Sequence, residues 1–177
     1  MHYDTRGAAP KAGSSLAETG HGLFPRGTLP SSSALALRLG MARVTHIVES
    51  SLYARDIKAT ANFYATVLGL SAMIETPRLV SFDAGNRSVL LVFQEGATGE
   101  DVKTDEGVIP GHDGQGRLHV ALGIPADSLS QWRERLATHS VPIVSETRWK
   151  GGGTSLYFHD PDGHVVELAT PGLWANY

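Results

Sequence analysis

The sequence predicts an α+β fold built from two βαβββ modules, whose curled mixed sheets surround a cleft. Two stretches, 44–94 and 117–170, each carry a strand pattern, a helix pattern and three more strand patterns in that order. The last two strands of each stretch are separated by residues typical of tight turns. Phe82 precedes Leu91 by the same number of positions as Phe158 precedes Glu167, so the two hairpins superpose.

Composition and charge exclude several classes of protein. The chain is 41% hydrophobic and 19% charged with a net charge of −3, so nothing favours a nucleic-acid or membrane-surface partner. No apolar run approaches the roughly 20 residues that span a bilayer. The chain has no cysteine, which excludes disulfides and thiolate chemistry and leaves nitrogen and oxygen ligands for any metal. Without a recognisable secretion signal, we expect a cytoplasmic protein.

Residues 1–40 differ from the rest of the chain. Gly, Pro, Ser and Ala dominate them, and no apolar period persists. Such a segment cannot bury enough surface to offset its ordering entropy. We therefore expect a disordered extension followed by a single domain over 41–177, with Met41 as a candidate for the start of the functional protein.

The first module is expected over 44–94. Its opening strand, 44–53, is rich in β-forming residues. Asp56 is a good N-cap for the helix that follows, and Gly69 is a good stop. Three strands complete the module, over 70–75, 79–84 and 88–94, the last two joined through Gly85-Asn86.

The connection 95–116 is polar, contains glycines and carries an acidic patch. Two interpretations stay open. The commoner one is a solvated linker, and the other is a lid that carries His112 over a site. On a lid, His112 would be able to act as an acid or base near pH 7.

The second module is expected over 117–170, with a tail over 171–177. Asp127 is the predicted N-cap of its helix, whose Leu129, Trp132 and Leu136 would face inward. The strands are predicted over 118–123, 142–146, 154–159 and 165–170, with a turn at Asp160-Pro-Asp-Gly163.

Glu167 lies between Val166 and Leu168 in the last predicted strand. A carboxylate in an apolar strand is costly to desolvate unless it has a cation or hydrogen-bond donors. Superposing the two modules proposes four equivalent inward positions, Glu49, Leu91, His119 and Glu167. Three of these four are residue types that bind metals.

From Met41 to about Trp174 the chain resembles the vicinal oxygen chelate superfamily, the group of glyoxalases, bleomycin resistance proteins and extradiol dioxygenases. The residues that carry the resemblance are Ala54-Arg-Asp56, Phe63-Tyr-Ala-Thr-Val-Leu-Gly-Leu70, Leu118-His-Val-Ala-Leu122 and Tyr157-Phe-His-Asp-Pro-Asp-Gly-His-Val-Val-Glu-Leu168. These motifs are specific for the fold and say little about the reaction. The resemblance also implies a homodimer.

The resemblance implies that the opening strand and fourth strand of each module supply metal ligands. His119 and Glu167 match the second module's ligand positions, and Glu49 stands where the first module's histidine is usual. Leu91 cannot bind a metal, which weakens the glyoxalase I assignment and leaves a three-ligand set. His46 is nearby, but in a regular strand it points to the face opposite Glu49 unless a bulge intervenes.

The first functional hypothesis is a divalent-metal-dependent enzyme, glyoxalase-like (lyase or isomerase) or dioxygenase-like. Its ion, Mn, Fe, Ni, Zn or Mg, would be held by Glu49, His119 and Glu167 and would chelate neighbouring oxygens of a small substrate. Glu49 and Glu167 are also the candidate catalytic carboxylates. The candidate substrate contacts are Tyr53, Gln94, His112, Trp149 and Tyr157.

The alternative is a metal-free protein that sequesters a small molecule, as the bleomycin resistance members do. Glu49 and Glu167 would then attract cationic ligand groups, and Trp149 would stack on the ligand. The replacement of one ligand position by Leu91 favours this alternative, whereas the retained pair of His119 and Glu167 opposes it.

Overall fold

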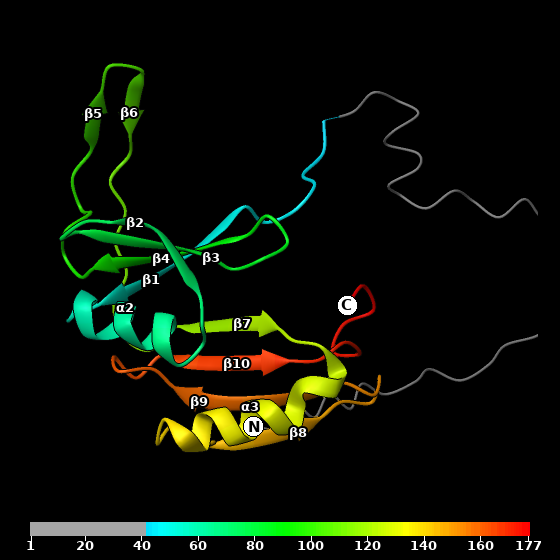
Figure 1. Ribbon diagram of the computed structural model, residues 1–177. Helices are drawn as coiled ribbons and strands as arrows, with labels where there is room; N and C mark the ends of the chain where they lie inside the picture. The colour runs from blue at the N-terminus through cyan, green and yellow to red at the C-terminus, as the bar shows by residue number, and fades with distance from the viewer. Residues whose placement is uncertain (1–41) are drawn as a thin grey trace, which may run out of the picture. The chain divides into compact units, whose positions relative to one another are not determined.

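The computed structural model describes residues 42–177. The chain divides into two units, Met1–Val44 and Thr45–Tyr177, and the fold described below is that of the second. The prediction of a disordered extension over 1–40 and a start at Met41 lies outside the described residues. The second unit contains two four-stranded sheets, two α-helices and a separate hairpin (Figure 1).

The first sheet has the strand order β1-β4-β3-β2. β1 runs parallel to β4, and the other neighbours are antiparallel. The elements of this module are β1 (Glu49–Ala54), α2 (Ile57–Thr66), β2 (Ser71–Glu75), β3 (Leu79–Asp83) and β4 (Val89–Gln94). Asp56 caps α2 as predicted, because its carboxylate accepts the N–H groups of Lys58 and Ala59 at 3.1 Å each. The opening strand begins only at Glu49, later than predicted.

The second sheet repeats this topology in the order β7-β10-β9-β8, with β7 parallel to β10. The duplicated βαβββ module is therefore confirmed. Its elements are β7 (His119–Gly123), the 3₁₀ turn η1 (Ala126–Ser128), α3 (Leu129–Thr138), β8 (Ser145–Arg148), β9 (Thr154–His159) and β10 (Val165–Ala169).

Two local predictions in the second module are wrong. Asp127 does not cap α3, because it lies within η1, and this turn moves the helix start to Leu129. The hydroxyl of Ser128 donates to the carbonyl of Pro125 at 2.7 Å and makes no cap for α3 either. β8 begins at Ser145 rather than at Pro142, since proline has no N–H to give to a strand ladder.

The connection between the modules contains secondary structure that has no signal in the sequence. It contains a short hairpin of β5 (Val102–Thr104) and β6 (Gly107–Ile109), which extends away from the two sheets in Figure 1. Strands of three residues are too short to show an alternation of apolar and polar residues in the sequence.

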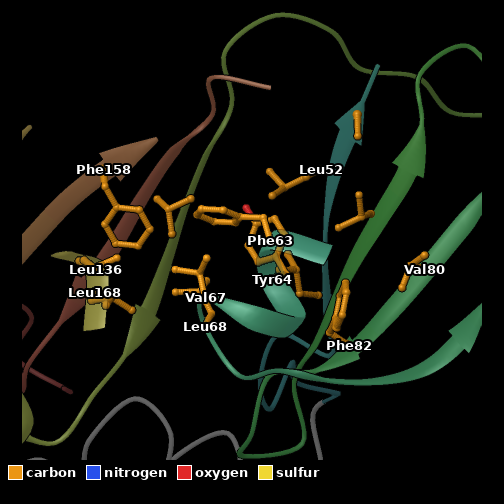
Figure 2. Packing of buried hydrophobic residues seen from close by; sticks show 14 of the residues in the cluster. Leu52, Phe63, Tyr64, Val67, Leu68, Val80, Phe82, Leu136, Phe158 and Leu168 are labelled. Atoms are coloured by element: carbon orange, nitrogen blue, oxygen red, sulfur yellow. The ribbon is translucent and has the colours of Figure 1, made fainter. Parts of the chain in front are cut away.

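One hydrophobic core joins the two modules (Figure 2). Phe63 of α2 lies 6.3 Å from Phe158 of β9 between ring centroids, and Tyr64 lies 6.1 Å from Phe82 of β3. α2 therefore packs against residues of both sheets. Burying each such side chain stabilises the fold by about 1.5–3 kcal/mol, so the core fixes the two sheets within one unit.

Candidate functional site

The ladders of the two sheets have the same register, which puts the predicted site residues at equivalent places. Glu49 of β1 pairs with Val89 of β4, and His119 of β7 pairs with Val165 of β10. Two positions further along β4 and β10 are Leu91 and Glu167. The equivalence of the four positions is therefore confirmed.

His119 and Glu167 lie together on one face of the second sheet. The imidazole Nε2 of His119 is 3.3 Å from a carboxylate oxygen of Glu167. Glu167 is only 4% exposed, whereas about half of the His119 side chain is exposed. The pair thus has a buried anionic side and a side open to an incoming ligand.

The orientation of His119 leaves its Nε2 free to bind a cation. Its Nδ1 lies 3.0 Å from the carbonyl oxygen of Val165, which accepts hydrogen bonds and cannot donate them. Nδ1 therefore carries the hydrogen, and Nε2 of the neutral ring directs a lone pair at Glu167. Lone pairs on an imidazole and a carboxylate repel at this distance, so a proton or a metal cation must lie between them. The donor set therefore fits a divalent ion.

A chain of hydrogen bonds holds the other carboxylate oxygen of Glu167. Ser155 on the neighbouring strand β9 donates its hydroxyl hydrogen to Glu167, and the same hydroxyl accepts the indole N–H of Trp149 at 2.8 Å. Two predicted site residues, Trp149 and Glu167, are therefore linked through one that sequence reasoning missed. Ser155 offers no sequence signal for this role, because serine is common in strands and turns alike.

Tyr157 lies on the same face of the second sheet, with its ring centroid 6.4 Å from that of His119. Burial raises the pKa of Tyr157, the hydrogen bond with Ser155 lowers it, and the charge of Glu167 raises it again. The net effect is a raised pKa, so the phenol stays protonated at neutral pH. It can then donate a hydrogen bond to an oxygen atom near His119.

Glu49 is not part of this cluster in the single chain. It is exposed, and residues 42–177 bring no three His, Asp or Glu side chains into one metal-binding group. The structure thus unites two of the three predicted ligands. The role of Glu49 stays a prediction that requires a partner for the first sheet.

Tyr53 and His112 meet on the face of the first sheet that also carries Glu49, since alternate residues of a strand share a face. The hydroxyl of Tyr53 is 2.7 Å from Nδ1 of His112, and the His112 ring packs against Phe93 at 4.8 Å between centroids. Thr98 holds the backbone of His112 through two hydrogen bonds, of 2.6 and 2.9 Å. The end of the connection between modules is therefore fastened onto the first sheet.

Gln94, the remaining predicted substrate contact, has a structural role. Its amide donates to the carbonyl of Arg55 at 3.0 Å and accepts the N–H of Ile57 at 3.3 Å, which holds the start of α2. It lines a groove of about 930 Å³ between α2, β2 and β3, whose lining includes none of the other candidate residues.

Three residues of the turn between β9 and β10 make contacts that the sequence analysis did not foresee. Asp160 accepts a hydrogen bond from the Tyr64 hydroxyl, and Asp162 binds Arg55 and Thr60 of the first module. His164 is buried and contacts the backbone of both modules. The sequence analysis identified Asp160 and Asp162 only as turn residues and gave His164 no role, because their partners lie far away along the chain.

The sequence matches one family model and several known proteins. Residues 43–168 match the family model described as Glyoxalase/Bleomycin resistance protein/Dioxygenase superfamily. The chain is 29% identical over 120 residues to "Metallothiol transferase FosB" of Bacillus licheniformis, covering 67% of this chain and 71% of that protein. The corresponding protein of Staphylococcus saprophyticus is 27% identical over 119 residues, covering 67% and 72%.

A solved structure also matches this chain. A structure described as lactoylglutathione lyase from Agrobacterium tumefaciens is 30% identical, with a TM-score of 0.69, and the match covers 76% of this chain and 99% of that one. Among residues 42–177, no helix is long and apolar enough to cross a membrane.

Proposed function

Because the chain belongs to the Glyoxalase/Bleomycin resistance protein/Dioxygenase superfamily, we propose that it is a divalent-metal-dependent enzyme acting on a small substrate chelated through neighbouring oxygens. The observation that supports this most directly is the facing pair of His119 Nε2 and the Glu167 carboxylate at 3.3 Å. With Nδ1 committed to the Val165 carbonyl, a proton or a metal cation must lie between the members of this pair, and the donor atoms suit a divalent ion.

We assign the third ligand to Glu49 of the partner subunit in a homodimer. Two protein ligands are fewer than the three that catalytic metal sites commonly use. Glu49 holds the place in the first sheet that His119 holds in the second. A two-fold dimer that lays the first sheet of one subunit over the second sheet of the other would complete two identical sites.

Exposed apolar side chains near the first sheet support such a dimer. Ile47 and Val48 directly precede Glu49, and Met73 belongs to β2 of the same sheet; all three are more than half exposed. Ile47 and Val48 lie next to edge strand β1 and Met73 lies in the opposite edge strand β2, so both edges of this sheet offer apolar contacts to a partner.

When bound, the ion would polarise a substrate oxygen as a Lewis acid. One imidazole and two carboxylates suit Mn²⁺, Fe²⁺, Ni²⁺, Zn²⁺ or Mg²⁺. Glu167 is fixed by Ser155 and serves to hold the site, whereas the exposed Glu49 is the better candidate for accepting a proton. Tyr157 would donate a hydrogen bond to a substrate oxygen, and Tyr53, His112 and Trp149 would contact the rest of the substrate.

Among possible reactions, we favour transfer or lyase chemistry on a thiol or a thiol adduct. The names of the similar proteins, metallothiol transferase and lactoylglutathione lyase, each contain a thiol compound. This chain has no cysteine, so the thiol would have to arrive with the substrate or as a co-substrate.

A metal-free binding protein is the alternative. One observation favours it: within 42–177 of a single chain, no third ligand joins His119 and Glu167. A protonated His119 would then satisfy Glu167 as an ion pair, and the exposed carboxylate of Glu49 would attract a cationic ligand.

Turnover by metal-loaded protein tests the proposal. Untagged protein is stripped with chelator, reloaded with each ion in turn, and assayed with methylglyoxal plus a small thiol, fosfomycin plus a small thiol, and a catechol plus O₂. We expect turnover with one of the thiol pairs that chelation abolishes and one of the ions restores. Glu167→Gln should lose it, and Glu134→Gln on the exposed side of α3 should keep it. Absence of turnover and of metal uptake, together with tight binding of a planar cation, would support the alternative instead.

A further inference from the structure

The turn between β9 and β10 supplies a buried imidazole that bridges the two modules. His164 is 1% exposed. Its Nδ1 accepts the backbone N–H of Leu118 at 3.1 Å, and its Nε2 lies 2.8 Å from the carbonyl oxygen of Tyr53. Since the carbonyl only accepts, the hydrogen is on Nε2, and one neutral ring acts as acceptor on one side and donor on the other.

Neither backbone group has a partner within the strand ladders: the Tyr53 carbonyl is on an edge strand, and the Leu118 N–H lies just before the first ladder pair of β7 with β10. β1 and β7 are the outer strands of their sheets. β10 begins at Val165, so it provides no ladder acceptor for the N–H of Leu118, just before β7. A buried backbone group without a partner costs free energy. The His164 ring provides both missing partners, because its Nδ1 accepts the N–H of Leu118 and its Nε2–H donates to the carbonyl of Tyr53.

The same dipeptide, His164-Val165, fixes His119 from two sides. The His164 ring holds the amide of Leu118, immediately before His119 in the chain. The carbonyl of Val165 holds Nδ1 of the His119 ring. A shift of the Leu118 backbone would therefore rotate the His119 ring away from Glu167.

We propose that His164 is a positioning residue for the metal site: it sets the start of β7, and through it the direction in which His119 presents Nε2. The effect on metal binding rests on the proposed function, whereas the effect on β7 does not. Ligand-orienting groups of this kind typically change metal affinity by about 10- to 100-fold when removed.

Asp162 offers a matched control, because it also joins the modules but does not touch β7. Its carboxylate binds Arg55 Nε at 2.9 Å, the Arg55 backbone N–H at 3.0 Å and the Thr60 hydroxyl at 2.6 Å. Loss of that contact weakens the link between modules and leaves the Leu118 hydrogen bond in place.

Three substitutions of His164 separate its two hydrogen bonds. His164→Leu removes both. His164→Asn keeps an oxygen where Nδ1 accepts from Leu118, and His164→Gln extends an amide N–H toward the Tyr53 carbonyl. The readouts are amide hydrogen exchange of Leu118 by NMR in the metal-free full chain, Mn²⁺ affinity by calorimetry, and thermal unfolding.

We expect His164→Leu to speed Leu118 exchange at least about tenfold and to weaken Mn²⁺ binding by about 10- to 100-fold. His164→Asn should restore both. His164→Gln should recover thermal stability alone, and Asp162→Asn should lose stability without changing exchange or affinity.

The inference is wrong if His164→Leu leaves Leu118 exchange unchanged, or if Asp162→Asn alters it as strongly. Should His164→Leu fail to fold, equal exchange rates in the Asn and Gln variants would overturn it. A wild-type chain that takes up none of Mn²⁺, Fe²⁺, Ni²⁺, Zn²⁺ and Mg²⁺ contradicts the proposed function, and the exchange pattern then still decides whether His164 positions β7.

Discussion

The chemistry of the site depends on how single side chains are held. Glu167 is buried in an apolar strand, where one of its oxygens accepts a hydrogen bond from Ser155 and the other faces His119 Nε2. His119 is directed by one backbone carbonyl. Each ligand therefore has one atom committed to the protein and one presented to a cation, which is the arrangement that metal ligands require.

Replacing Ser155 with alanine removes the donor to Glu167 and the acceptor for the Trp149 indole. We expect metal affinity to fall about tenfold, because the carboxylate loses the group that orients it. Mn²⁺ titration calorimetry measures this. Ser145→Ala, on an exposed position of the same sheet, is the control. Unchanged affinity in Ser155→Ala would show that Glu167 is oriented in another way.

Asp162 makes stability depend on pH in the acid range. Burial acts to raise its pKa, but the hydrogen bonds from Thr60 and Arg55 and the guanidinium charge outweigh burial and lower the pKa below its ordinary value of 3.8. A lowered folded pKa contributes stability above the unfolded value, and this contribution is lost as the pH falls below about 4.

We therefore expect Asp162→Asn to be less stable than wild type at pH 7 by about 1–3 kcal/mol, with the difference shrinking below pH 4. Urea unfolding at several pH values measures the difference. The pKa of Asp160 is shifted in the opposite direction, because burial above all raises it. Asp160 is present in both proteins, so the comparison between them isolates Asp162. A difference independent of pH would contradict the assignment.

Elements with strong local signals were predictable from the sequence, and elements that depend on distant contacts were not. Asp56 as a cap and Pro161 with Gly163 in a turn act within a few residues, so α2 and the β9–β10 hairpin were found. The pairing of His119 with Glu167 was found through the duplication. The roles of Ser155 and His164 were not, because each depends on a contact that only the folded sheets create.

The contact between the two helices gives a prediction at this scale. Arg135 of α3 donates from Nε to the carbonyl of Val67 at 2.5 Å and from its terminal nitrogen to that of Thr66 at 3.0 Å, at the end of α2. Its cation also complements the negative end of the helix dipole.

Arg135→Ala should lower the free energy of unfolding by about 1.5–3 kcal/mol, because it leaves these carbonyls without a charged donor. Urea denaturation measures the change. Arg133→Ala is the matched control, since its ion pair with Glu146 lies near the surface and such pairs contribute about 0–1 kcal/mol. Equal losses in the two variants would contradict a specific role for Arg135.

At the scale of the whole molecule, the account depends on two subunits sharing each site. Glu49 lies in β1, the counterpart of the β7 strand that carries His119, and Glu167 lies in the neighbouring inner strand β10 of the second sheet. Residues 42–177 of one chain do not bring Glu49 and Glu167 to a common ion. The duplicated module explains both facts if the first sheet of each subunit covers the second sheet of its partner.

Mixing two inactive variants tests the shared site. A dimer of a Glu49→Ala chain and a Glu167→Ala chain would contain one site with both substitutions and one with neither. Random mixing should therefore restore about one quarter of the wild-type turnover. Each variant alone is the control. Failure to recover turnover in proven mixed dimers would place all ligands in one chain.

Calorimetric titration of the metal-free protein with Mn²⁺ shows whether Glu49, His119 and Glu167 form one metal site. We expect one ion per chain, with affinity reduced at least about tenfold in each of Glu49→Gln, His119→Ala and Glu167→Gln, and wild-type affinity in Glu134→Gln. A wild-type protein that binds no ion, or a Glu167→Gln protein that binds as tightly as wild type, would contradict it.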